Sequence, residues 1–173
     1  MNTTSQNITS QHARKKTQKE VWEILKTVTD PEIPVLSVID LGIVREVNIE
    51  NQIAEIVITP TYSGCPAMDF IGMNIRKTLL ESGFDEIKIT HQFAPAWTTD
   101  WMTEEGKEKL KSYGIAPPNS KIVDLDYLNN LPVRCPHCNS MNTKLISQFG
   151  STACKALYQC EDCREPFDYF KCH

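Results

Sequence analysis

The chain has 173 residues, of which 40% are hydrophobic and 23% are charged, and its formal net charge is −4. This length allows one ordinary hydrophobic core and one small additional module, and the lack of a basic stripe argues against binding to nucleic acid. No apolar run is long enough to cross a bilayer and no secretory signal opens the sequence, so we expect a cytoplasmic protein that does not bind membranes.

Residues 1–16 are predicted to form a disordered tail, because they are mostly polar and offer little apolar surface to bury. The next residues, Thr17 to Glu20, match a capping box. Apolar residues then recur at helical spacing and predict a first helix with one buried face: Val21, Ile24, Leu25 and Val28. This helix should end near Thr29, because Pro31 disfavours helical geometry in the residue before it.

A stiff apolar loop is predicted at residues 30–42, DPEIPVLSVIDLG. Its prolines restrict the backbone, and its aliphatic side chains should pack on the core. The loop also carries Asp30, Glu32 and Asp40. Capping of a nearby helix is the interpretation we favour for Asp40, whereas Asp30 and Glu32 could border a site, hold a partner or supply oxygen ligands to a metal.

Residues 44–49 and 52–59 are rich in β-forming residues and predict a hairpin. Apolar residues at helical spacing then predict a second helix that ends at Gly83: Met68, Ile71, Ile75 and Leu79. Residues 87–93 alternate as a third strand. His91 shares the apolar side of this strand, so we expect it to be a hydrogen-bonded core histidine.

Between the hairpin and the second helix lies the segment TPTYSGCPAM. Gly64 permits a tight turn and Pro66 suits the start of a helix, which puts Cys65 at or beside the helix N-terminus. Unpaired backbone N–H groups and the helix dipole should favour the thiolate of Cys65, which could bind a soft metal or attack an electrophile. A small buried hydrophobe is the structural alternative.

A charged helix is predicted from Thr103 to Tyr113, and a linker follows at residues 117–131. Beyond the linker, two CxxC pairs are formed by Cys135 with Cys138 and by Cys160 with Cys163. Two such turns can supply four thiolates to one tetrahedral metal, so residues 132–173 are predicted to be a zinc ribbon stabilised by its metal. An iron–sulfur cluster on the same thiolates is the competing interpretation.

Several long motifs carry a resemblance to known families. The order of DPEIPVLSVIDLG, the hairpin and TPTYSGCPA is similar to the small α/β domain of SufT-type iron–sulfur maturation factors. FAPAWTTDWM and the C-terminal half resemble the PaaD (PaaJ) family, a component of phenylacetyl-CoA epoxidase systems. The resemblance implies an α+β fold, with an αββαβ-like iron–sulfur assembly domain at residues 17–116 followed by the C-terminal zinc ribbon.

The same resemblance implies a non-catalytic assembly factor for the phenylacetyl-CoA epoxidase complex in phenylacetate degradation. Such a factor would support iron–sulfur cluster delivery to the reductase component, with structural zinc in the ribbon and a transient cluster on Cys65. A homodimer could supply a second cysteine to that cluster. Other residues could border the site or contact a partner: Asp30, Glu32, Thr61, Cys154 and Cys172. For Cys154 and Cys172, which recur in the family pattern, ribbon packing is the alternative.

Two further functions remain open. The sequence shows no phosphate loop or dinucleotide fingerprint, but a thiol enzyme could use Cys65 as nucleophile and His91 as base. The chain could also be a structural subunit that stays in the oxygenase complex. Co-purification with the assembled complex would favour the structural role, and transient association would favour the assembly factor.

Overall fold

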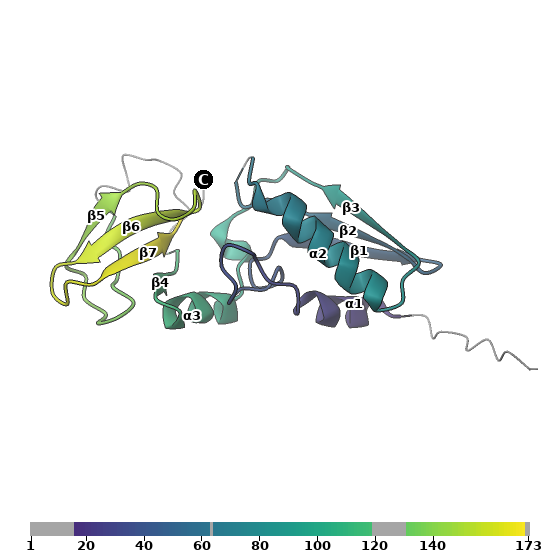
Figure 1. Cartoon of the computed structure of the whole chain (residues 1–173), viewed down its shortest axis with the longest axis horizontal. Helices are drawn as coiled ribbons and strands as arrows, with labels where there is room; N and C mark the ends of the chain where they lie inside the picture. The colour runs from purple at the N-terminus through teal and green to yellow at the C-terminus, as the bar shows by residue number, and fades with distance from the viewer. Residues whose placement is uncertain (1–15, 63, 119–130, 172–173) are drawn as a thin grey trace, which may run out of the picture.

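The computed structural model describes residues 16–62, 64–118 and 131–171. Nearly all of the predicted tail, most of the predicted linker and Cys172 lie outside these ranges. The described chain forms two lobes that are connected through helix α3 (Glu104–Ser112), as Figure 1 shows. Within the described ranges, no helix is long and apolar enough to span a membrane.

The N-terminal lobe is a three-stranded sheet with two helices packed against it (Figure 1). In the sheet order β1-β2-β3, β2 pairs antiparallel with β1 and parallel with β3. The elements follow the predicted αββαβ order: α1 (Gln18–Leu25), β1 (Val44–Glu50), β2 (Ile53–Ile58), α2 (Ala67–Glu81) and β3 (Glu86–His91).

Helix α1 begins as predicted, with Thr17 as N-cap and a complete capping box with Glu20. It ends at Leu25, which is earlier than the predicted end near Thr29. The chain leaves the helix because Thr29 forms an isolated antiparallel bridge with Ser37 in the following loop. Pairing with a distant residue therefore ends the helix before the proline does.

The loop at residues 30–42 packs on the core of this lobe, as predicted. Its most buried side chains are at most 1% exposed: Ile33, Leu36, Val38 and Leu41. The loop ends at Gly42, whose φ is +65°. A Cβ on Gly42 would lie 2.0 Å from the carbonyl oxygen of Trp101, so this close backbone approach requires glycine.

Asp40 joins this loop to α3. Its carboxylate accepts hydrogen bonds from the Ser37 N–H at 2.9 Å, from Lys109 Nζ at 2.9 Å and from the hydroxyl of Thr103, the N-cap of α3, at 3.2 Å. Burial raises the pKa of Asp40, but the hydrogen bonds from Lys109 and Ser37 outweigh it and hold the pKa below its ordinary value. Asp40 therefore acts as a structural anchor at the start of α3.

Replacing Asp40 with Asn should lower the free energy of unfolding by about 2 kcal/mol at neutral pH, because it weakens charge-assisted hydrogen bonds at a buried position. A carboxylate with a depressed folded pKa stabilises fully above its unfolded pKa of about 3.9, and this stabilisation is lost as pH falls through the folded pKa. Urea unfolding at neutral pH and at roughly pH 3 should therefore show a difference between the two proteins that shrinks in acid. A difference that is equal at both pH values would contradict the electrostatic role.

The prediction that His91 is a core residue is wrong. Burial declines along β3, from buried Ile87 through half-buried Ile89 to exposed His91. Strand β3 lies at the edge of the sheet and has a neighbouring strand on one side only, so alternation does not bury its last residue. The His91 ring instead lies beside exposed Phe93, with ring centroids 6.3 Å apart.

The C-terminal lobe is a four-stranded sheet in the order β4-β7-β6-β5. Its strands are β4 (Ile115–Ala116), β5 (Thr143–Ser147), β6 (Lys155–Cys160) and β7 (Pro166–Phe170). Strand β4 directly follows α3 and pairs parallel with β7. Residues 115–116, at the end of the predicted N-terminal domain (17–116), thus join the C-terminal sheet through a long-range strand pairing.

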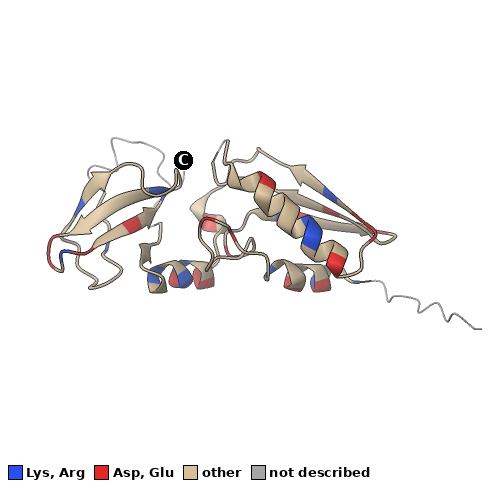
Figure 2. Cartoon of the chain, in the orientation of Figure 1, with Lys and Arg blue, Asp and Glu red and all other residues tan. Residues whose placement is uncertain are grey.

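The two lobes share part of one hydrophobic core. Cys154 and Phe170 of the C-terminal lobe belong to the cluster that fills the N-terminal lobe. The ring of Trp97 meets that of Phe170 edge-on, with centroids 6.2 Å apart, and its indole N–H donates to Leu41 O at 2.8 Å. Charged side chains gather on α3 at the connection between the lobes (Figure 2).

Candidate functional site

The ribbon cysteines lie in two turns with the same backbone design. The Asn139 N–H donates to Cys135 O at 2.9 Å, and the Arg164 N–H donates to Cys160 O at 3.0 Å. Asn139 and Arg164 each directly follow a CxxC pair and have positive φ values of 62° and 67°. This left-handed residue folds each turn back on its first cysteine, which is how one short segment presents two sulfurs together.

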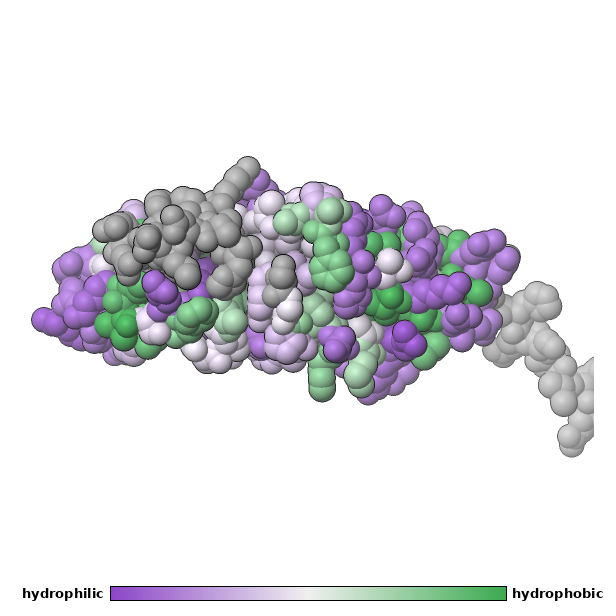
Figure 3. All heavy atoms as spheres, turned by 90° about the horizontal axis from the view of Figure 1, so that it is seen from above, coloured by the Kyte–Doolittle hydropathy of each residue, from purple (hydrophilic) through white to green (hydrophobic). Residues whose placement is uncertain are grey.

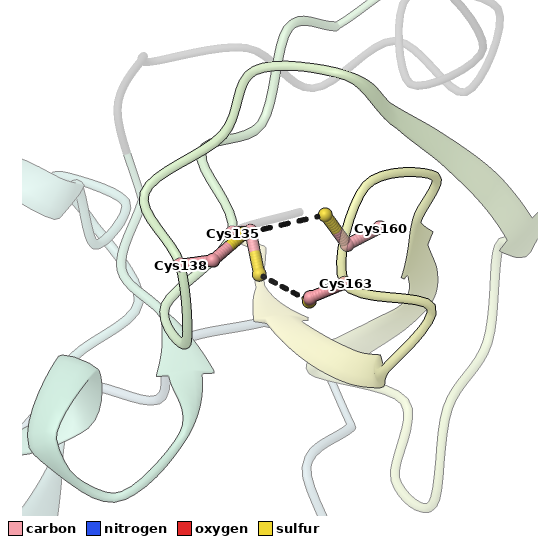
Figure 4. A group of neighbouring side chains, drawn as sticks. All are labelled: Cys135, Cys138, Cys160 and Cys163. Atoms are coloured by element: carbon pink, nitrogen blue, oxygen red, sulfur yellow. Dashed lines mark hydrogen bonds between the residues drawn. The ribbon is translucent and has the colours of Figure 1, made fainter.

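The four sulfurs converge on one point (Figure 4). All lie within 4.8 Å of one another, with Cys135 Sγ and Cys163 Sγ 3.8 Å apart and Cys138 Sγ and Cys160 Sγ 3.5 Å apart. A tetrahedral zinc with Zn–S bonds of about 2.3 Å requires sulfurs about 3.8 Å apart. The donor set and its spacing therefore fit one zinc ion held by Cys135, Cys138, Cys160 and Cys163.

The backbone around these sulfurs prepares them for metal ligation. The N–H groups of Cys163 and Asp162 lower the pKa of Cys160 to about 7, because they donate hydrogen bonds to its thiolate. Cys135 and Cys160 are fully buried, whereas Cys138 is exposed at the surface. Four protein thiolates leave no open position on a tetrahedral ion, which is the arrangement of a structural zinc site.

The second candidate site is the corner before α2. Cys65 lies one residue before Pro66, the N-cap of α2, and is half-buried. Its sulfur accepts hydrogen bonds from the Ala67 N–H and from the Tyr62 hydroxyl. The start of the helix thus offers donors to the Cys65 sulfur, as its predicted position implied.

The prediction that this position favours the Cys65 thiolate is nevertheless wrong. Burial raises the pKa of Cys65, and although the Ala67 N–H and the Tyr62 hydroxyl oppose this, Glu32 and Asp30 raise it further. Both acids come from the loop at residues 30–42, which packs beside the corner. Local helix geometry was therefore outweighed by burial and by two carboxylates that are distant in the sequence.

The ribbon contributes a second thiol to this neighbourhood. The Cys154 thiol donates to Glu32 Oε2 at 3.5 Å, although these residues are 122 positions apart in the sequence. Cys154 is 5% exposed, and its sulfur is hydrogen-bonded to Thr152 Oγ1 at 3.0 Å. Burial and the charge of Glu32 raise the pKa of Cys154 to about 12.

Asp30 holds Glu32 in place, because its carboxylate accepts the Glu32 N–H at 2.7 Å. Thr61 is half-buried and lines a small cavity of about 60 Å³ with Tyr62 and Trp97. Sequence reasoning missed Tyr62 as a site residue. Its place three residues before Cys65 in TPTYSGCPA was the available signal. Cys172 lies outside the described residues.

Comparisons with known proteins assign each part of the chain. Residues 18–86 match the family described as iron–sulfur cluster assembly protein, and residues 125–171 match the PaaD zinc beta ribbon domain. The domain of unknown function DUF59 from Bacillus anthracis, a solved structure, is 29% identical, covers 53% of this chain and 89% of its own, and superposes with a TM-score of 0.50. The N-terminal lobe therefore has the DUF59 fold.

Two relatives match over most of their own length. A protein of Porphyromonas gingivalis named Fe-S protein maturation auxiliary factor is 37% identical over 97 residues, which are 55% of this chain and 91% of the relative. A protein of Escherichia coli K12, named as the PaaD-type component of 1,2-phenylacetyl-CoA epoxidase, is 52% identical over 155 residues. This match covers 88% of the present chain and 92% of the relative. The chain therefore belongs to the PaaD family, in which an iron–sulfur assembly domain is joined to a zinc ribbon.

Proposed function

We propose that this chain is an assembly factor for a phenylacetyl-CoA epoxidase system in phenylacetate degradation, and that it passes iron or an iron–sulfur cluster to the reductase component. The metal or cluster is its cargo. The observation that carries the proposal is the half-buried thiol of Cys65 beside Tyr62, Glu32 and Asp30, in a domain that matches iron–sulfur assembly proteins. The reducing cytoplasm, where free thiols persist, is the compartment we assign to it.

The chemistry of the corner suits a transient cargo. Because the pKa of Cys65 is raised, a metal must displace the thiol proton when it binds, and this lowers the apparent affinity at neutral pH. A carrier needs moderate affinity, since a site that binds too tightly does not release its cargo. The closed set of four ribbon cysteines is the opposite case, and we assign it to a resident structural zinc.

Exposed apolar side chains near the corner offer a surface to a client protein. Phe70 and Met73, on the first turns of α2, are 57% and 64% exposed, and Phe93, which lines the same small cavity as Thr61, is 64% exposed. Figure 3 shows hydrophobic residues exposed among hydrophilic ones on one face of the chain. Contiguous exposed apolar groups are typical of protein interaction sites.

A thiol enzyme receives less support. An activated cysteine nucleophile requires a lowered pKa or an adjacent base, whereas the pKa of Cys65 is raised and the groups that act on it do not include His91. His91 is exposed and lies beside Phe93. These observations favour a non-catalytic role over nucleophilic catalysis by Cys65.

Co-expression of the epoxidase components with and without this chain tests the proposal. Without it, the reductase should accumulate normally but contain less iron and sulfide, and epoxidase activity should fall in proportion. A fully loaded reductase in the absence of the chain would overturn the proposal. Stoichiometric co-purification of the chain with the mature, fully loaded complex would favour the structural role instead.

A further inference from the structure

The acidic groups between the two lobes form one cluster drawn from three separate segments. Cys65 comes from the corner before α2, Glu32 from the loop at residues 30–42, and Cys154 from the ribbon just before β6. The Tyr62 hydroxyl hydrogen-bonds to Cys65 and also lies close enough to Glu32 and Cys154 for their charges to act on it. Tyr62 therefore stands between the two thiols.

The cluster is fixed by contacts on both sides. On the N-terminal side, Asp30 accepts the Glu32 N–H at 2.7 Å. On the ribbon side, Thr152 Oγ1 contacts Cys154 Sγ at 3.0 Å, and the Lys171 N–H donates to Cys154 O at 2.9 Å. Cys154 also packs in the core of the N-terminal lobe, so the seating of the ribbon determines where its sulfur lies.

The charge at this position is predominantly acidic. Asp30, Glu32 and the two thiols are all groups that become anionic, and each is partly or fully buried. Two cations lie nearby, but Lys155 forms an ion pair with Asp168 at 3.6 Å, and the Nζ of Lys171 lies over the ring of Phe149 at 4.1 Å. Buried anionic groups that are not paired with a cation side chain are typical of a site that receives a metal cation.

We propose that the two lobes together form a single cation site, in which Cys65, Cys154 and Glu32 bind a thiophilic divalent ion such as Fe(II) during transfer. This inference rests on the proposed function and names the ligands of its cargo site. Binding is ligation without redox change: each thiol releases its proton to solvent as its sulfur bonds to the metal, and Glu32 already carries its negative charge. The second cysteine then comes from the same chain, and a second copy is not needed to supply it.

The site is more open than the zinc ribbon. Among the described residues, the ribbon cysteines are the group whose ligand atoms already lie within 4.8 Å of one another. The groups between the lobes must move closer when the ion enters, and Tyr62 must give up its hydrogen bond to Cys65. A site that closes only around its ion favours release as well as capture, whereas the preformed ribbon site favours retention.

Anaerobic titration of the full chain with Co(II), a spectroscopic substitute for Fe(II), tests the inference on protein that holds zinc in its ribbon. Each thiolate bound to cobalt adds near-ultraviolet charge-transfer absorption. We expect Cys154→Ala to reduce this absorption by about half and to weaken binding at least about tenfold. Glu32→Gln should weaken binding similarly while leaving the absorption per bound cobalt unchanged. Glu23→Gln, at an exposed pair with Lys26 on α1, is the matched control and should match wild type.

The zinc content of every variant reports whether the ribbon remains folded, so a folding failure is distinguishable from a lost ligand. If Cys154→Ala binds cobalt like wild type while Cys65→Ala does not, the composite site is overturned and the proposed function survives with Cys65 alone. If the wild-type chain binds no cobalt beyond its ribbon, the cation site is overturned. The proposed function is then judged separately, by the iron content of the co-expressed reductase.

Discussion

An epoxidase system co-expressed with the Cys65→Ala variant should accumulate all its components at normal levels and yet lack activity. The reductase from these cells should be deficient in iron and sulfide. The physical reason is that alanine removes the thiol that precedes α2, while the Ala67 N–H and the Tyr62 hydroxyl that surround it remain. Neither of these donors can replace a soft thiolate ligand.

The fold should tolerate this substitution. Cys65 is half-buried, so alanine leaves a small cavity and should lower the free energy of unfolding by less than about 1.5 kcal/mol. Cys65→Ser should fail in the same way as alanine, because a hydroxyl is a much poorer ligand for a soft metal at neutral pH. Lys77→Ala, on the exposed surface of α2, is a matched control that should support full activity.

The measurements are epoxidase turnover in extracts and iron and sulfide analysis of the purified reductase. Full activity and a fully loaded reductase with Cys65→Ala would show that this thiol only packs the corner. The client surface and the cargo site would then have to be sought elsewhere on the chain.

Local signals in the sequence were sufficient for the elements of the N-terminal lobe. The capping box at Thr17 and the hairpin turn at Asn51 both depend on residues within a few positions of each other, and both are present in the structure. The CxxC turns are local in the same sense. Each turn is complete within six residues or so, and only their meeting depends on the fold.

Features that depend on distant segments could not be predicted. The pairing of β4 with β7 joins residues about fifty positions apart, and a strand of two residues has no periodic pattern to reveal it. The approach of Cys154 to Glu32 follows from how the ribbon seats on the N-terminal lobe. The raised pKa of Cys65 has the same origin, because the acids that oppose its ionisation come from a different segment.

Removal of the ribbon metal should unfold the C-terminal sheet and leave most of the helical circular dichroism intact. The native chain should contain about one zinc, and a chelator or the substitution Cys135→Ser should remove it. The ribbon then loses its main source of folding energy, since its own core is small. Helices α1 and α2 belong to the N-terminal lobe, and α1 packs on α2 and β1 and α2 on β3, so they should persist.

The N-terminal lobe should nevertheless become less stable, because it shares core residues with the ribbon. Loss of the ribbon withdraws Phe170 and Cys154 from its core, and loss of a buried aromatic ring from a core costs about 3–5 kcal/mol. Trp97, 5% exposed in the intact chain, should enter water, and its fluorescence should shift to longer wavelength. A single cooperative loss of sheet and helix signals on zinc removal would instead show that the two lobes fold as one unit.

The substitution Phe170→Ala separates these two effects. It should leave the zinc bound, because Phe170 is not one of the zinc ligands and lies outside both CxxC turns, yet it removes the ring that meets Trp97 edge-on. If the shared core carries the coupling, Phe170→Ala should reproduce the Trp97 shift and the lower urea midpoint while keeping one zinc per chain. If it reproduces neither, the loss of stability on chelation must pass through another connection, of which the pairing of β4 with β7 directly after α3 is the next to test.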